Sequence, residues 1–327
     1  MANGTSSLSL SPALLEDHRL PAIIIFVIST FGLYCHCFVM LSIQRVLCQN
    51  GPFYMLIASQ SLGETLTCAL FASYYSPMVF FNITSMKLWS PFVGIFLICF
   101  LDVVNCSHLV VTVNRLCAIC LPTKYGRYFC RRSTLAFIAI IWLVSTVPHI
   151  YFDGVLGCGI HYDDSIWGFL FNEEGVCHFV LWSIDFSKQL IIVISIAILD
   201  TITVIKVRLT SSKVVITGAK QAIAKRNVEV NFLKQAVGQF LLWIIEMFCY
   251  FFLSGLFSSI FMKWLLTTFA WNIMNTTDAV LVILLNKDIR HLFCHPSKLF
   301  VMPRFQKISR YVTVTVLSRG ANNSELA

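Results

Sequence analysis

The chain has 327 residues, of which 57% are hydrophobic and only 12% are charged. An average soluble domain holds about 25% charged and roughly 45–50% apolar residues. This composition excludes a soluble globular enzyme, a disordered chain and a nucleic-acid-binding module. The formal net charge of +8 is instead typical of the basic cytoplasmic loops of a membrane protein.

Seven apolar stretches are long enough to cross a bilayer as helices, because a span needs about 20 residues. The predicted spans are Pro21–Ile43, Phe53–Val79, Phe92–Leu116, Leu135–Tyr151, Phe186–Ile205, Leu233–Phe257 and Trp264–Leu285. We therefore predict an all-α membrane protein, with a tail at 1–20, a seven-helix bundle at 21–290 and a second tail at 291–327. Residues 1–20 are polar and no cleavable signal peptide precedes the first span, which we expect to act as the targeting signal.

The distribution of basic residues predicts the orientation of the bundle. With the amino terminus outside, only Arg19, Lys87, Lys188 and Lys263 lie outside, and the other 20 of the 24 basic residues lie inside. Basic loops remain cytoplasmic, so an extracellular amino terminus and a cytoplasmic carboxyl terminus are expected. Acidic residues crowd the outer loop between the fourth and fifth spans and give it a negative potential.

Several local motifs occur in a familiar order. Asn114-Arg115-Leu116 ends the third span, where rhodopsin-like receptors carry Asp-Arg-Tyr, and continues as Cys-Ala-Ile-Cys-Leu-Pro-Thr-Lys-Tyr. The other motifs are Ser59-Gln-Ser-Leu-Gly63, Glu229-Val-Asn-Phe232 with Gln235 and Gln239, and Asp278 with Asn286-Lys-Asp-Ile-Arg290. Over about residues 20 to 295 the chain resembles the nematode serpentine receptor class x (Srx) family.

The resemblance implies a chemosensory G-protein-coupled receptor of the plasma membrane, in sensory-neuron cilia. Its implied partners are a heterotrimeric G protein, a small-molecule or peptide ligand and the lipid bilayer. No enzymatic activity, cofactor or nucleic acid is implied.

The chain also departs from the wider receptor superfamily. His36 and Glu64 stand where asparagine and aspartate are usual. The sixth span lacks the Cys-Trp-x-Pro sequence, and Asp278-Ala-Val-Leu-Val282 replaces Asn-Pro-x-x-Tyr. Because spans five to seven contain no proline, proline-kinked hinges are not expected in them.

Asn114, Arg115 and Leu116 are the candidate coupling residues. The resemblance implies that Arg115 faces the cleft that receives the G protein, whereas the alternative is an ordinary cytoplasmic anchor. Since Asn114 replaces an acidic residue, Arg115 lacks an adjacent carboxylate, and we predict measurable basal activity.

Acidic residues inside apolar spans are costly and are usually paired or neutral. The candidate buried carboxylates are Glu64, Asp102, Asp200, Glu246 and Asp278. The predicted interior polar network consists of His36, Glu64, Asp102, Asn105, Asn275 and Asp278, with His108 on the same helix face as Asp102. A sodium site is one interpretation. We favour a hydrated hydrogen-bond network without a metal, in which one or both of Glu64 and Asp278 are protonated.

Cysteines and sequons suggest covalent modifications. No cysteine stands at the top of the third span, so we infer a disulfide between Cys158 and Cys177 within the outer loop, with two free thiols as the alternative. Asn3 and Asn82 head sequons on the outer side and are candidate glycosylation sites. Cys294 is a palmitoylation candidate.

A stretch over 286–300 could form a short amphipathic helix along the inner membrane surface. Aromatic and polar residues near the outer span ends suit a small organic ligand or, alternatively, form an interfacial belt. They are Tyr74, Tyr75, Trp89, His161, Tyr162, Trp167, His178, Trp182, Asp185, Trp264 and Trp271. A seven-span transporter or ligand-gated channel remains the alternative function, supported by the intramembrane acidic residues.

Overall fold

The computed structural model describes residues 18–44, 51–217, 234 and 237–296 of the chain. Within these residues, seven helical segments are long and apolar enough to cross a membrane. They are Arg19–Ser42, Pro52–Phe80, Thr84–Cys120, Arg131–Val155, Val176–Leu209, Val237–Leu256 and Ile260–Leu285. The predicted seven-helix bundle is confirmed.

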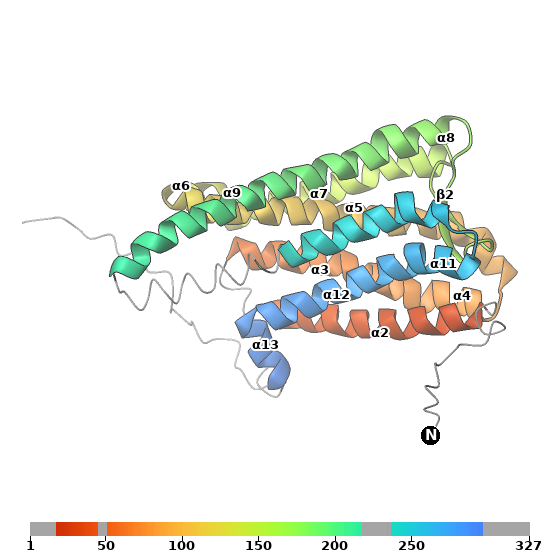
Figure 1. Cartoon of the computed structure of the whole chain (residues 1–327), viewed down its shortest axis with the longest axis horizontal. Coiled ribbons are helices and arrows are strands. Elements are labelled where there is room, and N and C mark those ends of the chain that lie inside the picture. Colours follow the sequence, from red (N-terminus) through yellow and green to blue (C-terminus); the bar gives the residue numbers. More distant parts are fainter. Residues whose placement is uncertain (1–17, 45–50, 218–233, 235–236, 297–327) are drawn as a thin grey trace, which may run out of the picture.

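The labelled elements build these spans and their connections. They are α2 (Arg19–Ser42), α3 (Pro52–Leu70), α4 (Ser76–Phe80), α5 (Thr84–Cys120), α6 (Pro122–Tyr128), α7 (Arg131–His149), β1 (Ile160–Asp163), β2 (Gly168–Phe171), α8 (Val176–Phe179), α9 (Ser187–Thr217), α11 (Ile260–Trp264), α12 (Ala270–Leu285) and α13 (Lys287–Cys294). The start of α2 and the two strands lie at one end of the bundle, and α6 and α13 lie at the other (Figure 1). We call these the hairpin end and the α13 end.

Five spans widen into short π-helical segments toward the hairpin end. These segments are Phe71–Tyr75, Ile150–Val155, Val180–Phe186, Cys249–Leu253 and Leu265–Phe269. A π-helical turn accommodates one extra residue and commonly marks a functional site. The last three spans, which contain no proline, therefore deviate from regular α-helix through these segments.

The third and fifth spans begin earlier than hydropathy predicts, at Thr84 and Val176. The first turn of the third span, Thr84-Ser-Met-Lys87, is too polar to register as an apolar stretch. The early parts of both spans contact the outer loop. The Ser90 hydroxyl accepts a hydrogen bond from the Tyr162 amide at 3.1 Å. The structure contains the disulfide between Cys158 and Cys177, which fixes the start of α8.

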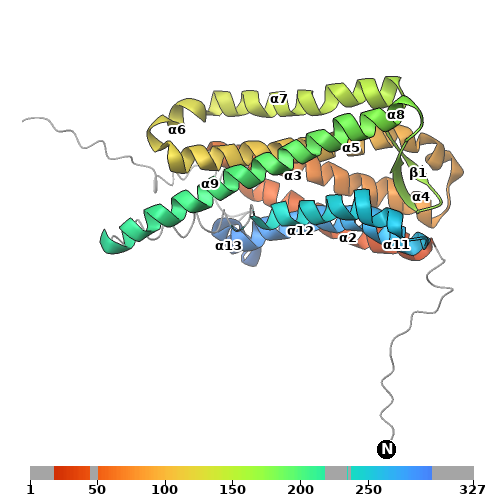
Figure 2. The same ribbon diagram turned by 45° about the horizontal axis from the view of Figure 1, so that its top comes forward.

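The outer loop forms an antiparallel hairpin that enters the bundle. Ile160 pairs with Phe171, and Asp163 pairs with Gly168. Figure 2 shows β1 lying across the ends of the helices at the hairpin end. Ile160 is 1% exposed and Phe169 is 2% exposed, so the hairpin is part of the hydrophobic core rather than a surface loop.

Close approach of the hairpin depends on a glycine in α5. A Cβ atom at Gly94 would lie 2.0 Å from the Ile160 carbonyl oxygen. Tyr75 adds a polar anchor, because its hydroxyl donates to the Trp167 carbonyl at 2.6 Å and accepts from the Trp264 indole at 3.2 Å. The hairpin is thus tied to spans two, three and seven.

At the α13 end, the chain turns directly from the seventh span into α13. Asn286 lies between the two helices, and its side chain accepts a hydrogen bond from the Ile289 amide at 3.4 Å. Phe293 packs edge-on against Phe38 of α2, with ring centroids 5.1 Å apart. The predicted amphipathic stretch over 286–300 is therefore helical over Lys287–Cys294. Residues 297–300 lie outside the described part.

Candidate functional site

A cavity opens among the third, fifth, sixth and seventh spans toward the hairpin end, with about 580 Å³ of space when its open mouth is included. The hairpin lines it through Ile160 and Phe171. The helical lining residues are Ile98, Leu101, Asp102, Asp185, Gln189, Trp243, Glu246, Met247, Tyr250, Phe251 and Trp271. An apolar and aromatic wall with a few polar groups is typical of small-molecule sites.

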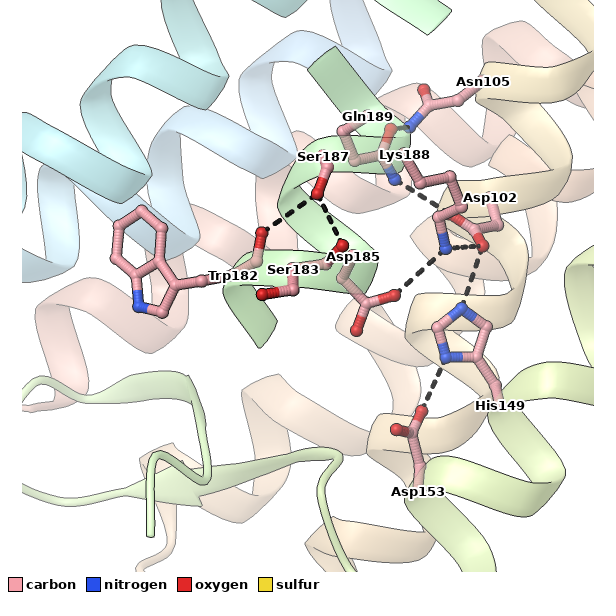
Figure 3. A network of polar contacts seen from close by, with 10 residues as sticks. All are labelled: Asp102, Asn105, His149, Asp153, Trp182, Ser183, Asp185, Ser187, Lys188 and Gln189. Carbon is pink, nitrogen blue, oxygen red and sulfur yellow. Dashed lines mark hydrogen bonds and ion pairs between the residues drawn. The ribbon is translucent and has the colours of Figure 1, made fainter. Parts of the chain in front are cut away.

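Asp102 of α5 is the centre of a polar network beside this cavity, which we call the outer network (Figure 3). Its carboxylate accepts hydrogen bonds from Lys188 at 2.5 Å, Gln189 at 2.8 Å and His149 at 2.9 Å. Lys188 also reaches Asp185 at 3.1 Å. Because Asp102 is 3% exposed, these donors compensate a carboxylate that water cannot reach.

The outer network extends from α5 to both flanking spans. His149 lies between two carboxylates, with Nε2 facing Asp102 and Nδ1 facing Asp153 at 2.7 Å. Only the doubly protonated ring can donate to both. Asn105, one turn below Asp102, donates to the Gln189 side chain at 2.7 Å. The network therefore ties spans three, four and five together.

A second cluster, the inner network, occupies the middle of the bundle. The His36 ring donates from Nε2 to the Asn275 carbonyl at 2.9 Å, and its Nδ1 lies 3.1 Å from Glu64. Gln60 donates to Asp278 at 2.8 Å and to Glu64 at 3.2 Å. These contacts connect the first and second spans to the seventh, which lies far away in the sequence.

The structure thus divides the predicted polar network in two. His36, Glu64, Asn275 and Asp278 form the inner network, whereas Asp102 and Asn105 belong to the outer one. The i, i+3, i+6 spacing on α5 explains the division, because six residues advance a helix by about 9 Å. His108, the last of the three, instead contacts Gln60 at 3.1 Å in the inner network.

One group of side chains could hold a metal ion. Ligand atoms of Glu64, His108 and Asp278 all lie within 4.8 Å of one another. The Gln60 amide nitrogen contacts all three of these residues, at 2.8–3.2 Å. Since an amide donor already links these acceptors, the arrangement is compatible with the hydrogen-bond network that the sequence favours.

Arg115 lies at the α13 end of α5 and is buried, at 7% exposed. Its guanidinium carbon lies 5.3 Å from the centre of the Phe53 ring. Asp200 of α9, 5% exposed, is the carboxylate that acts electrostatically on this guanidinium. The fifth span therefore supplies an acidic charge near Arg115, although neither Asp200 carboxylate oxygen has a hydrogen-bond partner among the described residues.

Asn114 and Leu116 stand beside Arg115 in different surroundings. Asn114 donates to the Tyr125 hydroxyl at 3.2 Å, which links the third span to α6. Burial raises the pKa of Tyr125, so the phenol remains protonated near neutral pH. Leu116 is only partly buried.

A second, smaller cavity of about 310 Å³ separates Arg115 from the inner network. His108, Arg115, Gln239 and Trp243 are among the residues that line it. Trp243 also lines the larger cavity. A single indole of the sixth span therefore borders both spaces, and no pattern in the sequence indicates this role.

The predicted ligand mouth overlaps the large cavity only at Asp185 and Trp271. Tyr75, Tyr162, Trp167 and Trp264 pack in the hydrophobic core instead, and Trp89 is exposed. Hydropathy patterns place aromatic residues at a membrane depth but do not give their direction around a helix. Glu246, which the sequence identifies as a buried carboxylate, lines the cavity.

The candidate modification sites lie at the surface or beyond the described residues. Asn82 is exposed in the turn between α4 and α5, with φ of 53°. Cys294 is exposed at the end of α13. Asn3 lies outside the described residues.

Comparisons with known proteins agree with this architecture. A family model described as the serpentine type 7TM GPCR chemoreceptor Srx matches residues 26–286. Serpentine receptor class X 45 of Caenorhabditis elegans is 27% identical over 299 residues, which cover 86% of this chain and 82% of the relative. Serpentine receptor class X-43 of the same nematode is 26% identical over 303 residues, covering 91% and 92%. Because the family match spans most of its length, the chain belongs to the Srx family of serpentine seven-transmembrane chemoreceptors.

Proposed function

We propose that this receptor binds a small organic molecule in the large cavity and, in response, activates a heterotrimeric G protein at the α13 end. The observation that carries the proposal is the position of Trp243, which borders both the large cavity and the smaller cavity beside Arg115. A ligand that displaces this indole alters the surroundings of Arg115 without touching it. The protein is then a binding and transduction protein rather than an enzyme.

The distribution of charge supports the orientation that this function requires. Basic residues concentrate on the loops of the α13 end, and such loops remain cytoplasmic. The cavity and its hairpin then face the outside, where a chemical cue arrives. The lining of the cavity supports a small molecule, because an apolar and aromatic wall with a few polar groups is typical of small-molecule sites.

Activation requires that the ligand prefers one arrangement of the helices. A ligand shifts a conformational equilibrium only by its difference in affinity for the two states. The outer network ties spans three to five, and the inner network ties spans one, two and seven. Neither network, as defined above from the described residues, includes a side chain of span six, which carries Trp243. We therefore expect span six to move relative to the rest of the bundle.

The test is G-protein dissociation in cells, with a panel of α-subunits and a mixture of small metabolites. Wild type is compared with Arg115→Ala at matched surface expression. Arg127→Ala is the control, because Arg127 is an exposed arginine on α6. The proposal predicts a basal or evoked signal that Arg115→Ala abolishes and Arg127→Ala preserves.

Two outcomes would contradict this proposal. Equal signals from wild type and Arg115→Ala would remove Arg115 from the coupling site. A whole-cell current evoked by the same metabolites, in the absence of any G-protein response, would instead support the channel alternative.

A further inference from the structure

We propose that the large cavity recognises a small organic cation, with Glu246 as its counter-ion. This inference rests on the proposed function, because it assigns a ligand class to the same cavity. The ligand carries a protonated or quaternary nitrogen attached to an aromatic or apolar body.

The charges of the cavity wall favour a positive ligand. Asp102, Asp185 and Glu246 line the cavity, whereas its lining includes no lysine or arginine from the described part of the chain. Lys188 compensates two of these carboxylates, through contacts of 2.5 Å with Asp102 and 3.1 Å with Asp185. Its ammonium is therefore committed within the outer network, and an anionic ligand would meet the negative wall.

Glu246 is the carboxylate that this network leaves out. Among residues 18–44, 51–217, 234 and 237–296, none forms a hydrogen bond or an ion pair with the Glu246 carboxylate. The side chain is partly buried in the sixth span and lines the cavity. A carboxylate in such a place is costly unless a cation or donor arrives to pair with it.

The surrounding side chains suit a cation with an apolar body. Trp243, Tyr250, Phe251 and Trp271 line the same cavity. Aromatic rings attract cations through their electron-rich faces and bind apolar groups equally well. In addition, Trp271 is 5% exposed, and its indole N–H has no acceptor in the described part of the chain. This buried N–H would gain an acceptor if the indole turned toward an oxygen of the ligand.

The test measures direct binding to the full-length receptor in lipid nanodiscs without any G protein. Three probes of similar size differ in charge: 2-phenylethylamine is a cation, 2-phenylethanol is neutral and 3-phenylpropionate is an anion. Binding is followed by thermal stabilisation of the receptor and by tryptophan fluorescence, since two indoles line the cavity. We expect the amine to bind about tenfold more tightly than the alcohol, because a hydrogen bond to a charged group is worth about one such factor.

Variants of Glu246 test the counter-ion. Glu246→Gln should lower amine affinity about tenfold and leave alcohol affinity unchanged. Glu246→Asp retains the charge and should retain the preference for the amine, which separates loss of charge from loss of folding. Glu174→Gln is the matched control, because Glu174 is an exposed acid of the outer loop that does not line the cavity.

Any of four outcomes would overturn the assignment: the alcohol binds as tightly as the amine, the anion binds best, Glu246→Gln leaves the amine preference intact, or the amine fails to bind at all at millimolar concentration. None of these depends on signalling. If the cation assignment fails while G-protein activation through Arg115 persists, only the ligand class is wrong.

Discussion

Replacing Gly94 with alanine is expected to push the hairpin away from α5. The added Cβ would lie 2.0 Å from the Ile160 carbonyl oxygen and 2.9 Å from its Cγ1, whereas ordinary contacts begin at 3.4 Å. The hairpin must therefore move away from α5 by about 1.4 Å. The atom that the new Cβ meets belongs to the Ile160 backbone, so no change of side-chain rotamer can relieve the clash. Overpacking of a core costs about 1–3 kcal/mol, and a backbone obstacle places Gly94→Ala at the upper end.

The net effect includes an opposing gain. Alanine in a helix interior is about 1 kcal/mol more favourable than glycine, so Gly94→Ala should lower the free energy of unfolding by about 2 kcal/mol. Gly126→Ala is the control, because nothing lies within 4 Å of its added Cβ. That substitution should be neutral or stabilising by up to about 1 kcal/mol.

Thermal and denaturant unfolding of the purified receptor in the same detergent measure this difference. Gly94→Ala should also weaken 2-phenylethylamine binding, because Ile160 lines the cavity. Equal unfolding midpoints for Gly94→Ala and Gly126→Ala would refute the close docking of the hairpin against α5.

Further predictions concern the outer network, the disulfide and the orientation. Lys188→Met should destabilise the receptor by about 2 kcal/mol, because it removes a cation that compensates the buried Asp102 carboxylate, and the partial exposure of Lys188 limits the loss. Adding Asp102→Asn should restore part of this stability. No recovery in a double-mutant cycle would argue against direct pairing of the two side chains. Cys158→Ser should cost about 3 kcal/mol by opening the loop that the disulfide closes, and thermal stability unchanged from wild type would contradict this. Hydrogen bonds with Ser133 lower the pKa of the exposed Cys130 thiol, which makes it reactive toward maleimides. Because Cys130 lies at the cytoplasmic end in the expected orientation, an impermeant maleimide should label it in a Cys294→Ser background only after permeabilisation. Labelling of intact cells would reverse the orientation.

The seven spans and the fold class could be predicted from the sequence because an apolar run of about twenty residues matches the thickness of a bilayer when it is helical. The starts of the third and fifth spans could not. The early parts of these spans contact the outer loop through Ser90 and Cys177, whose partners are Tyr162 and Cys158. Contacts of this kind depend on how distant segments meet, which hydropathy does not report.

The candidate site was predictable in its residue types but not in its grouping. Intramembrane carboxylates identified Asp102, Asp200 and Glu246 from the sequence, since charged residues within spans are rare and usually functional. Their partners come from other helices: Asp102 contacts Lys188, and Asp200 acts on Arg115. The rotation of each helix about its own axis decides these pairings. Because the spans are only weakly amphipathic, the sequence leaves that rotation undetermined.

The coupling of the cavity to a G protein is tested most directly by nucleotide exchange with purified components. The receptor in lipid nanodiscs is mixed with each member of a panel of heterotrimeric G proteins, and binding of a non-hydrolysable GTP analogue is followed over time. We predict that wild type accelerates exchange by at least one G protein even without ligand, that Arg115→Ala abolishes this acceleration and that Arg127→Ala does not. Exchange no faster than with empty nanodiscs across the whole panel, with or without cavity ligands, would contradict the proposed coupling.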